Sequence, residues 1–506
     1  MKISNTVSKL PGIAQAAVVM ATELNRRVLS EAGFVDSSID SASTSDMIVA
    51  IAANENSSLD AAVAETERLL VQGEKPVGEK TLPTSLEEAL ELSPDANLAV
   101  ISVPGQFARR EAMNALTRGL NVFLFSSNVP REEEVKLKKM AKEKGVLLMG
   151  PDCGTSIINH KVLGFGNAIH EGTIGLVSAS GTGLQEVTTL IHKAGLGISQ
   201  AIGTGGGDLS EQVGGTTMIQ SLELLEADSQ TKIIVLISKP PDPGALKKVL
   251  EVARRSTKPV VVNFLGADIS PDMLGNIRTV DTLDETAWVA CELAGVKTER
   301  YVQTIPSETL SHALVEHDKL AESQQYIRGL FSGGTLCYES EIVLKPILGD
   351  VFSNAAINPL FKVSGEPPSK KHTLIDMGAE EFVVGRAHPM IDFTLRDLRI
   401  LQEAKDPETA VILIDVELGY GSNSDPAGQL VPVIRKAKSF AMEAGRHLPV
   451  VASVVGTDGD FQDLVSQERA LSDAGVLIMP SNAQATRIAA VTAIGERIDD
   501  GMKRSQ

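Results

Sequence analysis

Residues 174–183 read IGLVSASGTG, and residues 327–336 read IRGLFSGGTL. Each stretch is a short apolar run that ends in Ser, Gly and Thr, and the residues that follow it suit a helix. A buried strand that passes through such a turn into a helix points free backbone N–H groups at one place, where the helix dipole favours an anion. The two stretches therefore predict a duplicated α/β unit with paired anion sites.

Further apolar runs follow both stretches in the same order. IIVLI (233–237) matches VILID (411–415), and VVVNFLGAD (260–268) matches VVASVVGTD (450–458). Strands that alternate with helices favour parallel sheets with right-handed crossovers. We therefore expect two flavodoxin-like domains, with ligands bound at the carboxyl ends of their strands.

The same alternation divides the whole chain into α/β domains. We expect a small N-terminal α/β domain at 1–80, a Rossmann-like domain at 86–168, and the two flavodoxin-like domains at 169–300 and 324–506. The polar, proline-containing stretch at 73–85 predicts a linker. No G-x-G-x-x-G motif follows a strand, which argues against binding of NAD.

Composition and charge exclude several classes of partner. The formal net charge of −18 argues against nucleic acid and anionic membrane surfaces, because both require a basic face. No apolar run approaches the roughly 20 residues that span a bilayer, and the N-terminus has no signal core. The three cysteines lie far apart, without metal spacing or a disulfide framework. We expect a cytoplasmic protein; a homo-oligomer is compatible with the sequence.

Six separated stretches resemble the FdrA family. They are MGPDCGTSIIN (149–159), VSASGTG (177–183), IGTGGGDLSEQVGG (202–215), VLISKPPDP (235–243), YIRGLFSGGTLCYE (326–339) and VGRAHPMID (384–392). Members of that family resemble succinyl-CoA synthetase. The resemblance implies a CoA-binding and ligase pair like the α subunit, then a ligase domain like the end of the β subunit. Family members often begin with a further strand before the equivalent of residue 7.

The phosphohistidine relay of succinyl-CoA synthetase is not expected here. In that enzyme a histidine in the loop after the last ligase strand carries phosphate between the nucleotide and acyl sites. In this chain the strand at 260–268 continues as ISPDMLGNIRTVDT, without a histidine, and SKPPDP (238–243) replaces the acidic loop that supports the phosphohistidine. No ATP-grasp domain is present. Without a nucleophilic histidine the chain cannot run the relay itself.

The resemblance implies another reaction that fits the remaining groups. Some FdrA-like proteins are associated with purine-ring catabolism as a subunit of oxamate carbamoyltransferase, which splits oxalurate with phosphate into oxamate and carbamoyl phosphate. This reaction needs two anion sites and oxyanion donors, but no covalent nucleophile. The expected partners are phosphate, a small anionic substrate and other protein subunits.

Two alternatives remain open. The chain can be a subunit of an acyl-CoA synthetase that binds CoA as its cofactor, with the ATP-grasp domain and phosphohistidine on another chain. From a different class, it can be a non-catalytic scaffold that senses CoA or a phosphate metabolite. The sequence itself requires no cofactor.

Three loops are predicted to bind anions. The first consists of Ser178, Ser180, Gly181, Thr182 and Gly183, and its partner of Ser332, Gly333, Gly334 and Thr335. The third contains Gly205, Gly206 and Gly207, since glycine lets a ligand approach the backbone. The competing interpretations are a tight turn with Ser180 as helix N-cap for the first loop, and a mobile flap for the third.

The loop GRAHPMID supplies the predicted catalytic residues. Arg386 can grip a carboxylate or phosphate, and His388 can act as general acid or donate to an oxyanion. Asp392 completes the group, although a structural loop with Asp392 as a helix cap explains it as well.

Other polar residues follow strands. Cys153 and Asn159 are predicted to line the site, with a buried, inert thiol as the alternative for Cys153. Lys239 can meet an anion or lie in solvent. Asp415 and Glu417 end a strand, but one acidic pair does not establish a metal site, and none is predicted.

Overall fold

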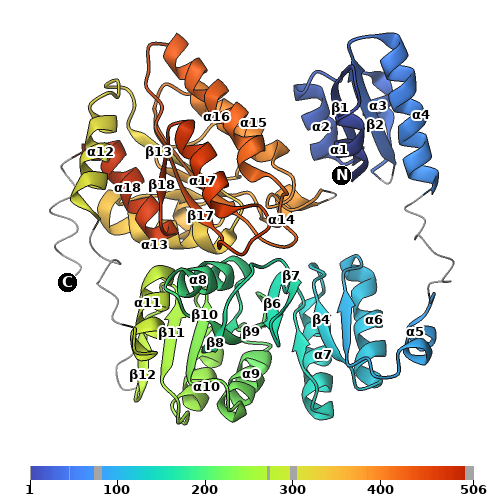
Figure 1. The fold of residues 1–506 in the computed structure, drawn as a ribbon, viewed down its shortest axis with the longest axis vertical. Coiled ribbons are helices and arrows are strands. Elements are labelled where there is room, and N and C mark those ends of the chain that lie inside the picture. The colour runs from blue at the N-terminus through green and yellow to red at the C-terminus, as the bar shows by residue number, and fades with distance from the viewer. Residues whose placement is uncertain are drawn as a thin grey trace.

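A computed structural model of the chain describes residues 2–44, 46–72, 83–269, 274–296, 305–384 and 386–495. The described strands form four sheets that follow one another along the chain, each accompanied by helices (Figure 1). This confirms the predicted multi-domain α/β architecture. The predicted linker at 73–85 lies mostly outside the described residues. Within them, no helix is both long and apolar enough to cross a membrane.

The N-terminal domain is built on two antiparallel strands. Its elements are α1 (Lys2–Ser8), β1 (Ile13–Met20), α2 (Glu23–Glu31), α3 (Ser37–Ser41), β2 (Met47–Ala53) and α4 (Asn56–Gln72). Its small core centres on Leu29, Ile39 and Ile48. An exposed ion pair, Arg27 to Glu366 at 2.8 Å, joins this domain to the last one. Such a pair contributes little to stability.

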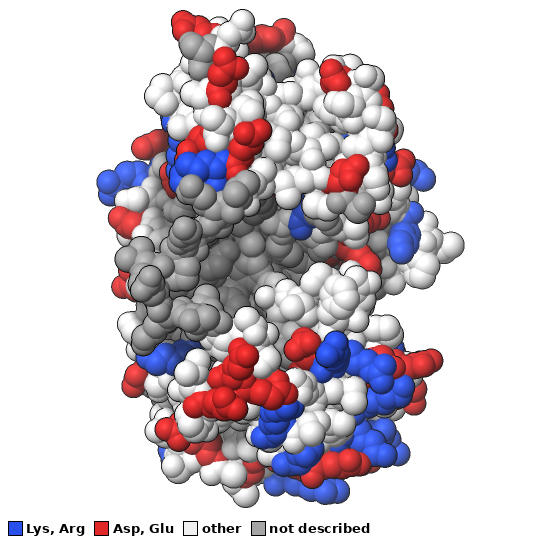
Figure 2. Space-filling view, turned by 90° about the vertical axis from the view of Figure 1, so that its right-hand side faces the viewer, with Lys and Arg blue, Asp and Glu red and all other residues white. Residues whose placement is uncertain are grey.

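The second domain has a three-stranded parallel sheet. Its elements are α5 (Leu86–Leu92), β3 (Leu98–Ile101), α6 (Gly105–Thr117), β4 (Asn121–Leu124), α7 (Arg131–Lys144) and β5 (Leu148–Met149). Figure 2 shows this domain in the lower half of the view, where basic and acidic side chains are interspersed. Among the described residues of that face there is no broad basic area, in line with the acidic net charge.

The third domain begins with an antiparallel hairpin that joins its sheet. The strand order is β12-β11-β10-β8-β9-β6-β7, and the strands from β8 to β12 run parallel. Its elements are β6 (Thr155–Ile158), β7 (Lys161–Gly164), β8 (Glu171–Ser178), α8 (Gly181–Lys193), β9 (Ile198–Gly203), α9 (Thr216–Ala227), β10 (Ile233–Ser238), α10 (Pro243–Ala253), β11 (Val260–Phe264), β12 (Ile277–Thr279) and α11 (Leu283–Leu293). The hairpin precedes the boundary expected from sequence at 168/169.

The fourth domain has a six-stranded parallel sheet in the order β14-β15-β13-β16-β17-β18. Its elements are α12 (Ser307–His317), β13 (Tyr326–Phe331), α13 (Gly334–Leu348), β14 (Phe352–Ser353), β15 (Thr373–Asp376), α14 (Glu380–Val383), α15 (Thr394–Lys405), β16 (Thr409–Glu417), α16 (Pro426–Glu443), β17 (Val450–Val455), α17 (Leu464–Asp473), β18 (Val476–Met479) and α18 (Asn482–Ile494).

The last two domains share one strand order. When strands are numbered from β8 in one domain and from β13 in the other, omitting the edge strand β14, both sheets read 2-1-3-4-5. This is the flavodoxin-like order, and it confirms the duplication predicted from the matched apolar runs. The carboxyl ends of β8 and β13 lead directly into α8 and α13.

A reciprocal pair of buried glutamates joins the two domains. Glu186 of α8 accepts a hydrogen bond from the backbone N–H of Asn482, the first residue of α18, at 3.0 Å. Glu339 of α13 accepts one from the N–H of Leu283, the first residue of α11, at 2.6 Å. Each domain therefore supplies a carboxyl group to the N-terminus of the other domain's last helix, where unpaired N–H groups favour an acceptor.

Burial makes this interface sensitive to protonation. It raises the pKa of Glu186 to about 7, with the neighbouring charges of Asp284 and Asp415 acting in the same direction and Lys193 against it. Burial also raises the pKa of Glu339. Because the folded state holds these protons more tightly than the unfolded chain, the contribution of Glu186 to stability falls as pH rises from about 4.5 towards 7.

We predict that Glu186→Gln becomes more stable relative to the wild type as pH rises. Glutamine keeps an oxygen for the N–H of Asn482 but has no proton to lose. The difference in unfolding free energy between variant and wild type should shift by about 2.5 kcal/mol between pH 5 and pH 8. Thermal or denaturant unfolding measures it, with the exposed Glu223→Gln as control. An equal pH dependence in all three proteins would contradict the burial of an acid here.

Candidate functional site

The two predicted anion loops meet across the boundary between the third and fourth domains. The hydroxyl groups of Ser180, before α8, and Thr335, in the first turn of α13, are hydrogen-bonded at 2.6 Å. The N-terminal ends of two helices from different domains therefore converge. Sequence reasoning placed a loop in each half, and the structure shows that they form one location.

The first loop is closed on one side by its own hydroxyls. Ser178 Oγ accepts from the N–H of Ser180 at 2.9 Å, and Ser180 Oγ accepts from the N–H of Gly183 at 2.9 Å. Ser180 is thus the N-cap of α8, as the alternative interpretation of this loop, a tight turn, predicts. The N–H groups of Gly181 and Thr182 have no acceptor among the described residues, and both residues are only partly buried. Two donors are left for an anion.

The second loop binds a carboxylate of the protein itself. The N–H groups of Ser332 and Gly333 donate to the two side-chain oxygens of Asp415 at 2.7 and 2.6 Å. Asp376, at the end of β15, lies so close to Gly334 that a side chain at position 334 would collide with its carboxylate. Of the four N–H groups in this loop, those of Gly334 and Thr335 have no acceptor among the described residues.

Arg396 of α15 is hydrogen-bonded to the second loop and to the carboxylate that this loop binds. Its Nη1 donates to Ser332 Oγ at 2.6 Å and to the backbone oxygen of Asp415 at 2.8 Å, and it pairs with Asp415 Oδ1 at 3.1 Å. Next to this ion pair, burial and the charge of Asp415 raise the pKa of Glu417 well above its usual range. Sequence analysis missed Asp376 and Arg396, although the strand end in LIDMG was a usable signal for Asp376.

His388 lies at the second loop as a neutral group. Its Nδ1 accepts from the N–H of Met390 at 3.3 Å, so Nε2 carries the hydrogen. A Cβ atom on Gly378 would be 2.8 Å from both His388 Nε2 and the backbone oxygen of Ser332, and 3.2 Å from Asp376 Oδ1. Burial lowers the pKa of His388 to about 4. The imidazole can therefore donate a hydrogen bond, but it carries no charge near neutral pH.

The other two predicted catalytic residues interact within their own loop. Arg386 Nη2 lies 3.7 Å from Asp392 Oδ2. Asp392 Oδ1 accepts from the backbone N–H of Thr394, where α15 begins, at 3.0 Å. Asp392 is therefore engaged in the turn before the helix, whereas Arg386 Nη1 is buried without a partner among the described residues.

Lys239 brings a positive charge to the convergence of α8 and α13. It follows β10, and its ammonium lies 5.6 Å from the ring centre of Tyr338 in α13. Burial raises the pKa of Asp376, and the charge of Lys239 acts in the opposite direction, which places the two groups near each other. No hydrogen-bond acceptor contacts this ammonium among the described residues.

The glycine loop at 203–208 packs against the second domain. Gly205 has φ +83°, and side chains at 205 and 207 would collide with the backbone of Pro151 and with the guanidinium of Arg131. Asp208 caps α9 and pairs with the buried Lys138 at 2.6 Å. Close packing explains Gly205 and Gly207, and the ligand role predicted for Gly206 has no contact that supports it.

The two remaining predicted residues are engaged within the protein. Cys153 is buried, and burial raises the pKa of its thiol to about 11. Asn159 lies in the turn between β6 and β7, where its N–H donates to Gln200 at 2.8 Å and its oxygen accepts from Gln200 at 3.0 Å. Cys153 therefore fits the alternative interpretation, a buried and inert thiol. Asn159 has no hydrogen bond with the N-terminus of α8 or α13 among the described residues.

Comparison with known families identifies three matched regions. The model described as AllF, heavy metal-associated domain, matches residues 1–83; the CoA binding domain matches 170–266; and the CoA-ligase model matches 330–492. The region 170–266 contains the open first turn of α8 and Lys239. This donor set suits a ligand that carries phosphate, as CoA does.

Individual relatives agree with these matches. The uncharacterised protein YahF of Escherichia coli (strain K12) is 44% identical over 484 residues, 95% of this chain and 93% of YahF. The ADP-forming succinate–CoA ligase subunit alpha 2 of Archaeoglobus fulgidus is 33% identical over 223 residues, 41% of this chain and 75% of that subunit. The crystal structure of PH0766 from Pyrococcus horikoshii OT3 covers 80% of this chain and 86% of its own at 16% identity, with a TM-score of 0.33, too low to support a functional comparison.

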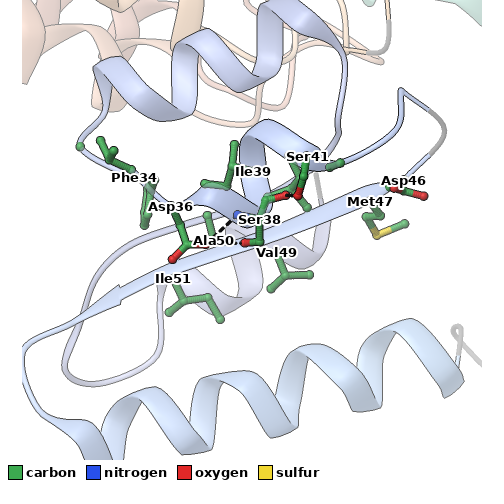
Figure 3. Close-up of a pocket in the computed structure, with 14 residues that line it drawn as sticks. Phe34, Asp36, Ser38, Ile39, Ser41, Asp46, Met47, Val49, Ala50 and Ile51 are labelled. Carbon is green, nitrogen blue, oxygen red and sulfur yellow. Dashed lines mark hydrogen bonds between the residues drawn. The ribbon is translucent and has the colours of Figure 1, made fainter.

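The N-terminal residues do not fit a heavy-metal ion. Residues 1–83 contain no cysteine and no histidine, the ligands that soft metals prefer. A hollow of about 950 Å³ beside β2 offers carboxylates, hydroxyls and a single thioether, that of Met47, as Figure 3 shows. Asp36 accepts from the N–H of Ser38 at 2.8 Å, and Asp46 from that of Ser43 at 2.8 Å. The carboxylates are thus engaged in turns.

We predict that the cysteines of the native protein resist alkylation. Burial raises the pKa of Cys153 to about 11, that of Cys291 to about 12, and that of Cys337 well above its usual value. At pH 8 about one Cys153 in a thousand is then a thiolate. Iodoacetamide followed by mass spectrometry should modify all three only after denaturation. The exposed Ser229→Cys is the reactive control, and rapid labelling of native Cys153 would restore it as a nucleophile.

Proposed function

Because this chain belongs to the FdrA family of succinyl-CoA synthetase-like proteins, we propose that it is a subunit of an enzyme that transfers a carbamoyl or acyl group to phosphate. The specific reaction is that of oxamate carbamoyltransferase, in which oxalurate and phosphate give oxamate and carbamoyl phosphate. A phosphate oxygen bonds to the ureido carbonyl carbon, the bond from that carbon to the amide nitrogen breaks, and the nitrogen leaves with a proton as oxamate.

The observation that carries this proposal is the convergence of α8 and α13 beside Lys239. Each helix N-terminus carries roughly half a positive charge. With the ammonium, the location offers about two positive charges, which matches the charge of phosphate near neutral pH. Asp376 offsets part of the contribution of α13, so the open donors of Gly181 and Thr182 on α8 are the stronger half of the proposed phosphate site.

His388 fits the second requirement of the reaction, a donor for the oxyanion. A neutral imidazole that donates through Nε2 stabilises negative charge on the attacked carbonyl oxygen without first giving up a proton. A well-placed donor of this kind contributes roughly 3–4 kcal/mol to the transition state. The low pKa of His388 keeps it in this donor form at neutral pH.

We predict that Lys239→Ala impairs the use of phosphate. The variant removes the ammonium group from the proposed phosphate site, so kcat/KM for phosphate should fall about 10- to 100-fold. The assay is formation of carbamoyl phosphate from oxalurate by the chain with its partner subunits. Lys232→Ala is the matched control, because Lys232 precedes β10 at the opposite end and is exposed. Full activity of Lys239→Ala would contradict the proposed phosphate site and favour a non-catalytic scaffold.

The CoA-ligase match supports a second candidate, a subunit of an acyl-CoA synthetase. In that case the donors at α8 and Lys239 would meet a phosphate of CoA. Calorimetric titration of the whole chain with CoA separates the two candidates. For the carbamoyl transfer we expect no micromolar binding of CoA and measurable binding of phosphate. Micromolar binding of CoA that Lys239→Ala weakens would favour the synthetase.

A further inference from the structure

Strand β2 of the N-terminal domain has one edge without a neighbouring strand. Among the described residues its sheet consists of β1 and β2 alone. The hollow of about 950 Å³ is lined by every residue from 46 to 51 and by residues around α3, but by none of β1 (Figure 3). Successive side chains point to opposite faces of a sheet, so a hollow that touches consecutive residues lies at the edge. This hollow therefore follows the free edge of β2.

Hydrogen bonds at the two ends of the sheet show which backbone groups face the hollow. The carbonyl oxygen of Asp46, before β2, accepts from the residue after β1, and the N–H of Asn54, after β2, donates to the residue before β1, both at 2.8 Å. Backbone groups of a strand point alternately to its two sides, so the even-numbered residues between them bond to β1. Met47, Val49 and Ile51 therefore direct their N–H and C=O groups at the hollow. These groups have no partner among the described residues.

Apolar side chains accompany the open backbone groups. Met47 is 52% exposed and Val49 is 40% exposed, whereas Ile48 and Ala50, on the opposite face of the strand, are buried in the domain core. An added strand would cover the exposed side chains and pair the backbone groups at the same time. Donors and acceptors that repeat at the spacing of a strand suit an extended polypeptide as the occupant.

The charges beside the hollow indicate what kind of strand fits. Asp36 and Asp46 are the charged side chains of its described lining, and both are acidic. Asp46 precedes the Met47 end of the strand, and Figure 3 shows Asp36 towards the Ile51 end. A second copy of β2, paired antiparallel about Val49, would bring Asp36 of one copy towards Asp46 of the other. The net charge of −18 adds to this repulsion, so a strand with basic ends fits better.

We propose that the free edge of β2 binds an extended segment of a partner protein that is apolar in its centre and carries Lys or Arg at both ends. The segment pairs with Met47, Val49 and Ile51 as a third strand of the sheet. Its basic ends lie beside the carboxylates of Asp36 and Asp46. The N-terminal domain thereby acts in assembly, a role that does not depend on the reaction proposed for the other domains.

Binding of two labelled peptides to the whole chain, measured by fluorescence anisotropy, tests the proposal. The probes are Lys-Val-Thr-Val-Thr-Val-Lys and the same peptide with Glu at both ends. The wild type should bind the lysine peptide at least tenfold more tightly than the glutamate peptide, and salt should reduce this preference. The double variant Asp36→Asn, Asp46→Asn keeps an acceptor oxygen for each turn and should reduce the preference to less than threefold.

The variant Val49→Pro separates strand pairing from other contacts. Proline removes an N–H that faces the hollow and leaves the groups that bond to β1, so the domain should still fold. Affinity for the lysine peptide should fall at least tenfold. Val49→Thr keeps the N–H and is the matched control, expected to bind within about threefold of the wild type. Hydrogen exchange followed by mass spectrometry needs no variant: the lysine peptide should slow exchange at residues 47–51 of the wild type.

Four results would overturn the inference. They are no binding of the lysine peptide at millimolar concentration, equal binding of both peptides, unchanged exchange at residues 47–51, and wild-type binding by a folded Val49→Pro. Sedimentation of the whole chain tests the competing occupant. A concentration-dependent dimer that Val49→Pro abolishes would assign this edge to a second copy of the chain and would likewise overturn the proposed basic partner.

Discussion

The arrangement of the last two domains depends on two buried glutamates that they exchange. Glu186 caps α18 of the other domain, and Glu339 caps α11 in return. Each carboxyl group satisfies a backbone N–H that would otherwise be buried without an acceptor, so separating the domains exposes both ends of the exchange at once. The same helices, α8 and α13, carry the predicted anion loops at their first turns. The exchange therefore holds these two turns against each other, and the hydroxyl contact between Ser180 and Thr335 marks where they meet.

A shared backbone does not give the two loops the same chemistry. The first loop closes on its own hydroxyls and leaves the donors of Gly181 and Thr182 open. In the second loop two N–H groups already donate to Asp415, and the carboxylate of Asp376 lies next to Gly334. A helix N-terminus that already faces carboxylates attracts a further anion less strongly. The duplication therefore supplies one location with an open, cationic side and an acidic, arginine-containing side.

Local patterns in the sequence predicted the elements, and tertiary contacts decided the roles. Apolar runs identified the strands, and Ser180 was recognisable as a cap, because both depend on neighbours within a few residues. Arg396 lies in TLRDLRILQ, whose charges suggest an exposed helix face. It is nevertheless buried against Asp415 of strand β16. Gly205 and Gly207 suggested a ligand loop, whereas their neighbours are Pro151 and Arg131, more than fifty residues away in sequence. Such contacts leave no local signal.

The loop after β17 adds a mechanical argument for direct transfer to phosphate. In the duplicated strand order β17 is the counterpart of β11, the strand that by resemblance precedes the relay histidine of succinyl-CoA synthetase, and the loop after β17 reads TDGDFQD (457–463), also without a histidine. Asp460 accepts from the N–H of Ala168 at 2.8 Å and from Asn167 at 2.7 Å, and Asp458 contacts His192 at 2.6 Å. A relay requires a loop that moves between two sites. This loop is instead bound across the domain boundary by these contacts and by a hydrogen bond from Thr457 Oγ1 to the backbone oxygen of Ala168 at 2.7 Å. Chemistry in which both substrates meet at fixed donors is what such an anchored loop permits.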